Sequence, residues 1–193
     1  MNQSTPGFDE SCLDIIYPCV VHKSWANRSR ASSLMSWQFS DDVRLVLMLD
    51  SDDALRSVAP EELEPLGISQ QQALAIATDN LSAAWERGEF EFASDELKDG
   101  TRIAMAQGNW KAPAAGLLLL DFFEALKNEF EAERFAAAAL NQECLFAFPT
   151  DERTLGSTSL LVAMEEQIHR HRQPISRSLL LLDGRWPRPF EEP

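Results

Sequence analysis

The stretch from Val43 to Leu49 reads VRLVLML and is apolar at every position except Arg44. An apolar run of this length without alternation is typical of a strand that is buried on both faces of its sheet. Residues 35–39 form a second expected strand, which the polar turn at residues 40–42 joins to the first. A third strand is expected at residues 19–23. The sequence therefore predicts a sheet with Val43 to Leu49 at its centre.

The rest of the chain alternates irregularly between helix and strand patterns. Ser69 and Gln72 match a capping box, which predicts a helix over about residues 70–87. Further helices are expected over residues 113–131 and 155–172, with a short acidic one that begins at Pro60. Strands are expected at residues 89–92, 101–107, 135–140, 144–148 and 178–182. This order predicts one α+β domain over residues 1–193, with a mixed or antiparallel sheet, about three main helices, and frayed tails at 1–11 and 187–193.

Charge is the most unusual property of the chain. Its 193 residues include 31 acidic and 17 basic side chains, which gives a formal net charge of −14. The bias is uneven, because residues 61–135 hold 15 acidic and 6 basic residues, a net of −9. Nucleic acids and anionic membranes attract basic proteins, so the composition argues against both as partners. The N-terminus lacks a signal-peptide pattern and no apolar run has membrane length, so we expect a cytoplasmic location.

The sequence lacks the motifs of common catalytic and cofactor sites. Neither GxGxxG nor GxxxxGK[ST] occurs, which excludes nucleotide binding through those loops. The three cysteines, Cys12, Cys19 and Cys144, do not have the spacing of a zinc site. His169 and His171 are two residues apart, so on a helix their rings point in different directions. We therefore expect no metal site and no cofactor.

Two groups of residues leave an enzyme as the alternative. The first is His22, which lies on an expected strand and could meet the distant Cys144 in a thiolate–imidazole pair. The second is Asp50 with Asp52 and Asp53, directly after the core strand, where aspartates often bind metals. The glycine and glutamate of an EF-hand loop are missing there. A solvated loop is the simpler interpretation of this second group.

Several segments resemble a known family in their order along the chain. PCVVHKSW at residues 18–25, VRLVLMLD at 43–50 and VAPEELEPLGISQQQALAIATDNL at 58–81 are similar to the YtpQ-like family of uncharacterised bacterial proteins. The C-terminal half, from FPTDE at residues 148–152 through PISRSLLLLDG at 174–184 to Trp186, also resembles that family. The resemblance covers about residues 15–186 and implies a single-domain fold. The family has no established activity, so the resemblance implies no mechanism.

The charge bias points to a basic protein as the partner. The sequence predicts a non-catalytic binding protein, most concretely a bacterial immunity protein that neutralises a cognate toxin, because a toxin that degrades nucleic acid needs a basic surface. The densest carboxylates are the expected partner-binding residues: Asp41, Asp42, Asp52, Asp53, Glu61, Glu62 and Glu64. Since residues 41–42 and 52–53 flank the core strand, the 52–64 subset is the preferred patch. Trp110 is the expected apolar anchor beside the charges.

Overall fold

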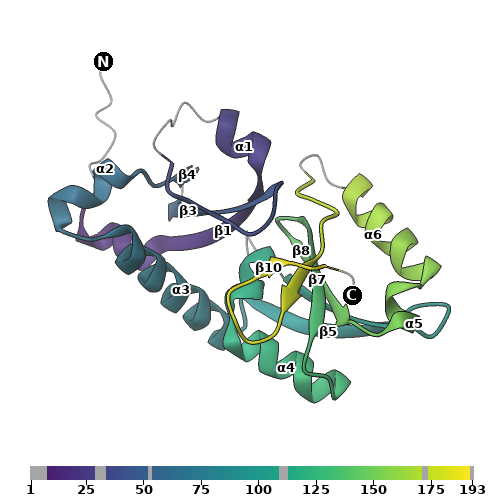
Figure 1. Cartoon of the computed structure of the whole chain (residues 1–193). Coiled ribbons are helices and arrows are strands. Elements are labelled where there is room, and N and C mark those ends of the chain that lie inside the picture. Colours follow the sequence, from purple (N-terminus) through teal and green to yellow (C-terminus); the bar gives the residue numbers. More distant parts are fainter. Residues whose placement is uncertain (1–7, 29–33, 52–53, 109–112, 171–173, 192–193) are drawn as a thin grey trace.

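The structure is a computed structural model that describes residues 8–28, 34–51, 54–108, 113–170 and 174–191. It has an α+β fold with two antiparallel sheets, whereas the sequence predicted one sheet (Figure 1). The four-stranded sheet contains β1 (Ile16–His22), β2 (Ser36–Gln38), β3 (Val43–Ser51) and β4 (Ala54–Ser57). The six-stranded sheet has the order β10-β9-β7-β8-β6-β5. Its strands are β5 (Phe90–Glu96), β6 (Arg102–Gly108), β7 (Phe135–Asn141), β8 (Cys144–Pro149), β9 (Leu180–Leu182) and β10 (Arg188–Pro189).

Helices connect and cover the two sheets. The α-helices are α1 (Lys23–Arg28), α2 (Pro60–Leu63), α3 (Gln70–Glu86), α4 (Leu120–Phe130), α5 (Glu152–Leu155) and α6 (Thr158–Arg170). Three 3₁₀ helices complete the set: η1 (Glu10–Ile15), η2 (Glu64–Leu66) and η3 (Pro113–Leu118). The predicted capping box of α3 is present, because Ser69 Oγ accepts from the Gln72 amide and Gln72 Oε1 accepts from the Ser69 amide. Helix α3 then packs against β1.

The central position of the Val43 to Leu49 stretch is confirmed. Strand β3 pairs with β1 along one side and with β2 and β4 along the other. Leu45, Val46 and Leu47 are fully buried. Consecutive side chains of a strand point to opposite faces, so burial of all three means that both faces of β3 are covered.

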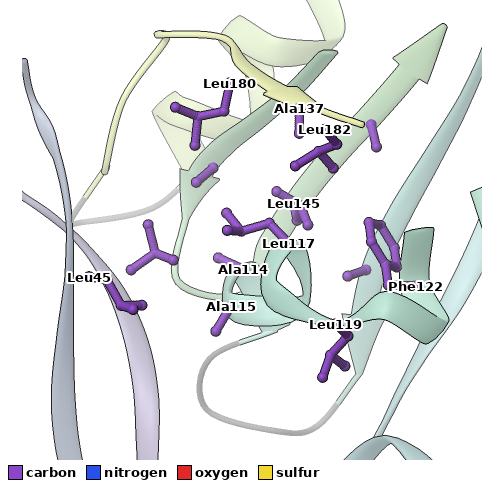
Figure 2. Packing of buried hydrophobic residues seen from close by; sticks show 14 of the residues in the cluster. Leu45, Ala114, Ala115, Leu117, Leu119, Phe122, Ala137, Leu145, Leu180 and Leu182 are labelled. Carbon is purple, nitrogen blue, oxygen red and sulfur yellow. The ribbon is translucent and has the colours of Figure 1, made fainter. Parts of the chain in front are cut away.

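One hydrophobic core joins the two sheets. It contains Leu45 of β3 together with Leu145 and Leu180 of the six-stranded sheet. Figure 2 shows η3 between them, with Ala114 and Leu117 between Leu45 on one side and Leu145 on the other. Because both sheets bury apolar side chains against the same short helix, they form one domain.

One of the three main predicted helices is interrupted, and another begins later than predicted. Residues 113–131 divide into η3 and α4, because Leu119 between them has extended backbone angles (φ −83°, ψ 127°). Residues 113–117 are all buried, so packing between the sheets overrides the helical propensity there. The helix predicted over residues 155–172 corresponds to α6, which begins at Thr158, and the short helix α5 before it ends at Leu155. Ser157 precedes α6 and caps it, since its hydroxyl accepts from the Leu160 amide at 3.0 Å.

Both predicted tails are ordered within the described residues. Near the N-terminus, the Asp9 carboxylate accepts from the Ser11 amide at 2.9 Å and begins η1. Near the C-terminus, β10 pairs with β9, and the Phe190 amide donates to the Leu179 carbonyl at 3.0 Å. The N-terminal bond is a local helix cap, whereas the pairing of β10 with β9 depends on a separate strand and leaves no signal within residues 187–193.

Several strand boundaries also differ from the prediction, and the largest extension is that of β5, predicted at residues 89–92, which continues to Glu96. Strand β1 ends at His22, and Lys23 begins α1 instead of ending the strand. Strand β4 was not predicted, and it forms a hairpin with the end of β3, where Asp50 lies opposite Leu55. The sequence reading placed Asp50 in the loop after the core strand, whereas it belongs to β3.

Candidate functional site

A groove lies where the two sheets meet. It has a volume of about 760 Å³ and lies beside the end of β1, the beginning of α1, the turn before β3 and residues 174–178. Its polar lining includes His22, Ser24, Asp42, Gln142 and Arg177. A groove with converging polar groups is the natural first place to look for a ligand or catalytic site.

Asp42 is the only aspartate of this lining, and internal hydrogen bonds occupy its carboxylate. Oδ1 accepts from the hydroxyls of Ser40 and Ser178, each at 2.8 Å, and Oδ2 accepts from the hydroxyl of Ser176. Burial acts to raise the pKa of Asp42, but the three serine hydroxyls outweigh it and hold that pKa below its ordinary value. Asp42 therefore ties the turn before β3 to the segment before β9.

His22 has a capping role at the beginning of α1. Its Nδ1 accepts from the Ser24 amide at 3.1 Å and lies 2.8 Å from Ser24 Oγ. Arg177, on the far side of the groove, forms a two-point ion pair with Glu165 of α6 at 2.5 and 2.8 Å. Asp42, His22 and Arg177 thus each have a hydrogen-bond or ion-pair partner within the protein.

The cysteines do not form the thiolate–imidazole pair of the enzyme alternative. Burial raises the pKa of the Cys19 thiol and of the Cys144 thiol to about 12 in each case. Cys19 Sγ accepts from Gln142 Nε2 at 3.5 Å, whereas His22 is bonded to Ser24. Burial thus disfavours the thiolate form that such a pair needs.

The described part of the chain contains no set of side chains that could bind a metal ion. Within residues 8–28, 34–51, 54–108, 113–170 and 174–191, no three His, Cys, Asp or Glu side chains lie close enough to hold a metal ion. Asp52 and Asp53, which the sequence analysis grouped with Asp50, lie outside the described residues.

The other predicted partner-binding residues have different surroundings. Asp41, Glu61 and Glu64 are exposed. Glu62 is bound internally, because its Oε1 pairs with Arg56 at 2.7 Å and its Oε2 accepts from the Ala59 amide at 2.8 Å. Trp110 lies outside the described residues.

The structure does not bring these carboxylates together. Asp41 precedes β3, whereas β4 runs back along β3, so the Val58 amide, just before α2, donates to the Leu47 carbonyl at 2.9 Å. A strand rises about 3.3 Å per residue, so the stretch of β3 from Val43 to Leu47 separates the two groups by roughly 13 Å. Because Asp52 and Asp53 lie outside the described residues, the division into two patches stays a prediction.

A larger acidic region surrounds α3. Helix α3 contacts η1, α2 and β5, and η2 continues α2. These five elements contain no lysine or arginine. They contain ten acidic residues: two in η1, two in α2, one in η2, two in α3 and three in β5.

Seven of these carboxylates are exposed and form no ion pair or side-chain hydrogen bond with the residues that the structure describes. They are Glu10, Asp14, Glu61, Glu64, Asp79, Glu86 and Glu91. We call these seven side chains the acidic surface. The sequence analysis placed the interface in residues 41–64 and so included two of the seven. A signal for the rest was present, because residues 57–86 include no lysine or arginine.

Exposed apolar side chains lie elsewhere. Trp186 is 44% exposed and packs beside Phe39, with ring centroids 5.2 Å apart. Leu120, Leu161 and Val162 are more exposed still. Among the described residues, Trp186 is thus an exposed aromatic side chain, whereas the sequence analysis proposed Trp110 as the apolar anchor.

No described helix is both long and apolar enough to cross a lipid bilayer. Comparison with known proteins gives no match to a family model, to a curated protein or to a solved structure. The resemblance to the YtpQ-like family stays a prediction from the sequence.

Proposed function

We propose that this chain is a non-catalytic binding protein that uses its acidic surface to hold a basic protein, as an immunity protein holds its cognate toxin. The observation that carries the proposal is the set of five neighbouring elements with ten carboxylates and no basic residue. Unpaired carboxylates of one sign repel each other, and an oppositely charged partner relieves that repulsion.

The chemistry of the groove supports binding over catalysis. Its carboxylate accepts three serine hydroxyls, its histidine caps a helix, and its arginine is paired with Glu165. Catalysis requires a nucleophile or base that is free to meet a substrate. The acidic surface, in contrast, consists of side chains that no described residue neutralises.

A nuclease-type toxin is the kind of partner that this charge fits best. An enzyme that acts on nucleic acid presents lysine and arginine to phosphates, and an acidic protein can cover that surface. Opposite charges also accelerate encounter, with association rates that fall as salt screens the attraction.

The test begins with affinity capture of the tagged protein from extracts of its source cells, followed by mass spectrometry. We expect one basic protein in near-stoichiometric amount, which is then purified and titrated against two triple variants. The first carries Glu61→Lys, Asp79→Lys and Glu86→Lys on the acidic surface. The control carries Glu131→Lys, Glu152→Lys and Glu191→Lys, three exposed carboxylates outside it.

The first variant should associate roughly 10–100-fold more slowly at low salt, with a flatter salt dependence, because steering depends on these charges. The control has the same net charge and should retain most of the rate. Equal loss in both variants would mean that net charge matters and this surface does not. An unchanged rate in the first variant would refute the proposal.

A further inference from the structure

Strand β5 is the outermost strand of the six-stranded sheet. It pairs antiparallel with β6 over its whole length, from Phe90 opposite Gly108 to Glu96 opposite Arg102, without a register shift. No other described strand pairs with its outer edge. An open edge of this kind presents unpaired backbone amides and carbonyls.

The hairpin turn fixes which residues of β5 face outward. The Leu97 amide donates to the Thr101 carbonyl at 2.8 Å, so Leu97 faces β6. Backbone groups of an antiparallel strand alternate in direction, so Phe92, Ser94 and Glu96 face away from β6. The Glu96 amide agrees with this assignment, because it donates to its neighbour Asp95 at 2.8 Å instead of to a strand.

Phe92 and Ser94 thus offer two amide donors and two carbonyl acceptors at the edge. No described residue forms a backbone or side-chain hydrogen bond with these groups beyond the sheet. The Phe92 side chain points into the core, where its ring packs against Phe122 with centroids 6.0 Å apart. This packing holds the edge in place.

The other edges of the two sheets are less suited to accept a strand. Strand β10 has two residues, and Pro189 has no amide proton to donate. Strands β2 and β4 have three and four residues. Edge strand β1 has seven, but its Pro18 has no amide proton, and the Asn80 side chain donates to the Ile16 carbonyl at 2.9 Å. Strand β5 has seven, with no proline and no bulge.

The side chains of β5 select the charge of an incoming strand. Glu91, Asp95 and Glu96 are exposed, and β5 contains no basic residue. A second copy of β5 would bring these carboxylates against one another, which is unfavourable across a strand pair. A strand that carries lysine or arginine would meet them with opposite charge.

We propose that β5 is the docking strand for an extended, lysine- or arginine-rich segment of the partner, which adds to the six-stranded sheet as a seventh strand. This inference rests on the proposed function and specifies how the basic partner binds. Backbone hydrogen bonds at Phe92 and Ser94 hold the segment, and the carboxylates of β5 select its charge.

The probe is a synthetic peptide with the sequence Lys-Val-Lys-Thr-Lys-Val-Lys, blocked at both ends, and its binding is followed by fluorescence anisotropy at low salt. Ser94→Pro removes an outward amide that bonds to no other strand, and proline is tolerated at such edge positions. Ser94→Ala keeps that amide and is the matched control. We expect Ser94→Pro to weaken binding at least fivefold and Ser94→Ala to bind within twofold of the wild type.

A second measurement does not depend on the folding of the proline variant. The same peptide with methylated amides at its three central residues keeps its charge and loses its donors, and it should bind the wild type at least fivefold more weakly. Equal binding of both peptides, or of Ser94→Pro and Ser94→Ala, overturns the docking strand and leaves the acidic surface as a partner site. If neither peptide binds the wild type, the docking strand and the basic-partner function both fail. A dimer of the wild type that Ser94→Pro abolishes would make a second copy the occupant and would also overturn the proposal.

Discussion

Replacing Asp42 by alanine should destabilise the fold strongly, because this carboxylate joins the two sheets. Its three hydrogen-bond donors, Ser40, Ser176 and Ser178, would lose their acceptor. Ser40 and Ser176 are 6% and 7% exposed, so water replaces the carboxylate poorly there. A buried donor without an acceptor costs about 1–3 kcal/mol, so two such donors predict a loss of roughly 3 kcal/mol. For a chain of this size, that loss lowers the Tm by about 6–12 °C.

Chemical denaturation of the Asp42→Ala variant measures this loss directly. The neighbouring variant Asp41→Ala is the control, because Asp41 is exposed and has no side-chain partner, and its stability should change by less than about 0.5 kcal/mol. If the two variants unfold with the same free energy, the carboxylate does not join the sheets and the reasoning is wrong.

The pH dependence gives an independent check on Asp42. Its folded-state pKa is lowered, so its ionised form contributes fully above the unfolded carboxyl pKa, near 4, and the contribution is lost as pH falls through the folded pKa. The stability difference between wild type and Asp42→Asn should therefore shrink below about pH 4. A difference that stays constant from pH 7 to pH 3 would contradict the assigned hydrogen bonds.

Three further outcomes follow from the core and the backbone. Leu47→Asp places a charge in a fully buried position and should abolish folding, so a variant that melts like the wild type would show that β3 is misplaced. Gly108→Ala should cost about 2–5 kcal/mol, since φ is +155° and a Cβ would lie 2.7 Å from Phe90 Cα, and a neutral effect on urea unfolding would refute that contact. Cys19 and Cys144 should resist a thiol-reactive disulfide reagent at pH 8 until denaturant is added, because both pKa values are near 12, and rapid labelling of the native protein would contradict their burial.

The features that the sequence predicted correctly have local causes. The apolar run in β3 and the Ser69–Gln72 capping box each depend on residues a few positions apart, so their spacing is visible without any fold. The hairpin turn before β6 is local in the same way, because Gly100 adopts φ +80°, a conformation that glycine accommodates without strain. Local chemistry determines these elements almost independently of the rest of the chain.

The features that the sequence missed depend on distant contacts. Asp42 was assigned to the partner interface because it is an acidic residue in a turn, yet its hydroxyl donors Ser176 and Ser178 are 134 and 136 positions away. No sequence pattern in residues 40–42 indicates that Ser176 and Ser178 lie next to Asp42. The division of one predicted sheet into two has the same cause, since η3 separates the sheets only when residues from both pack around it.

Under the proposed function, the position of the carboxylates would let β5 accept a basic partner strand while opposing pairing with a second copy of the chain. The edge at β10 is closed to every strand, because a proline there removes the donor whatever the partner's charge. The edge at β5 keeps its donors and carries three carboxylates, which oppose only strands of the same sign. The carboxylates of β5 therefore exclude only acidic strands, whereas a proline weakens the pairing of any strand. Neighbouring α3 adds Asp79 and Glu86, so under the proposed function the same charges that oppose pairing with a second copy would draw a basic strand towards the open edge.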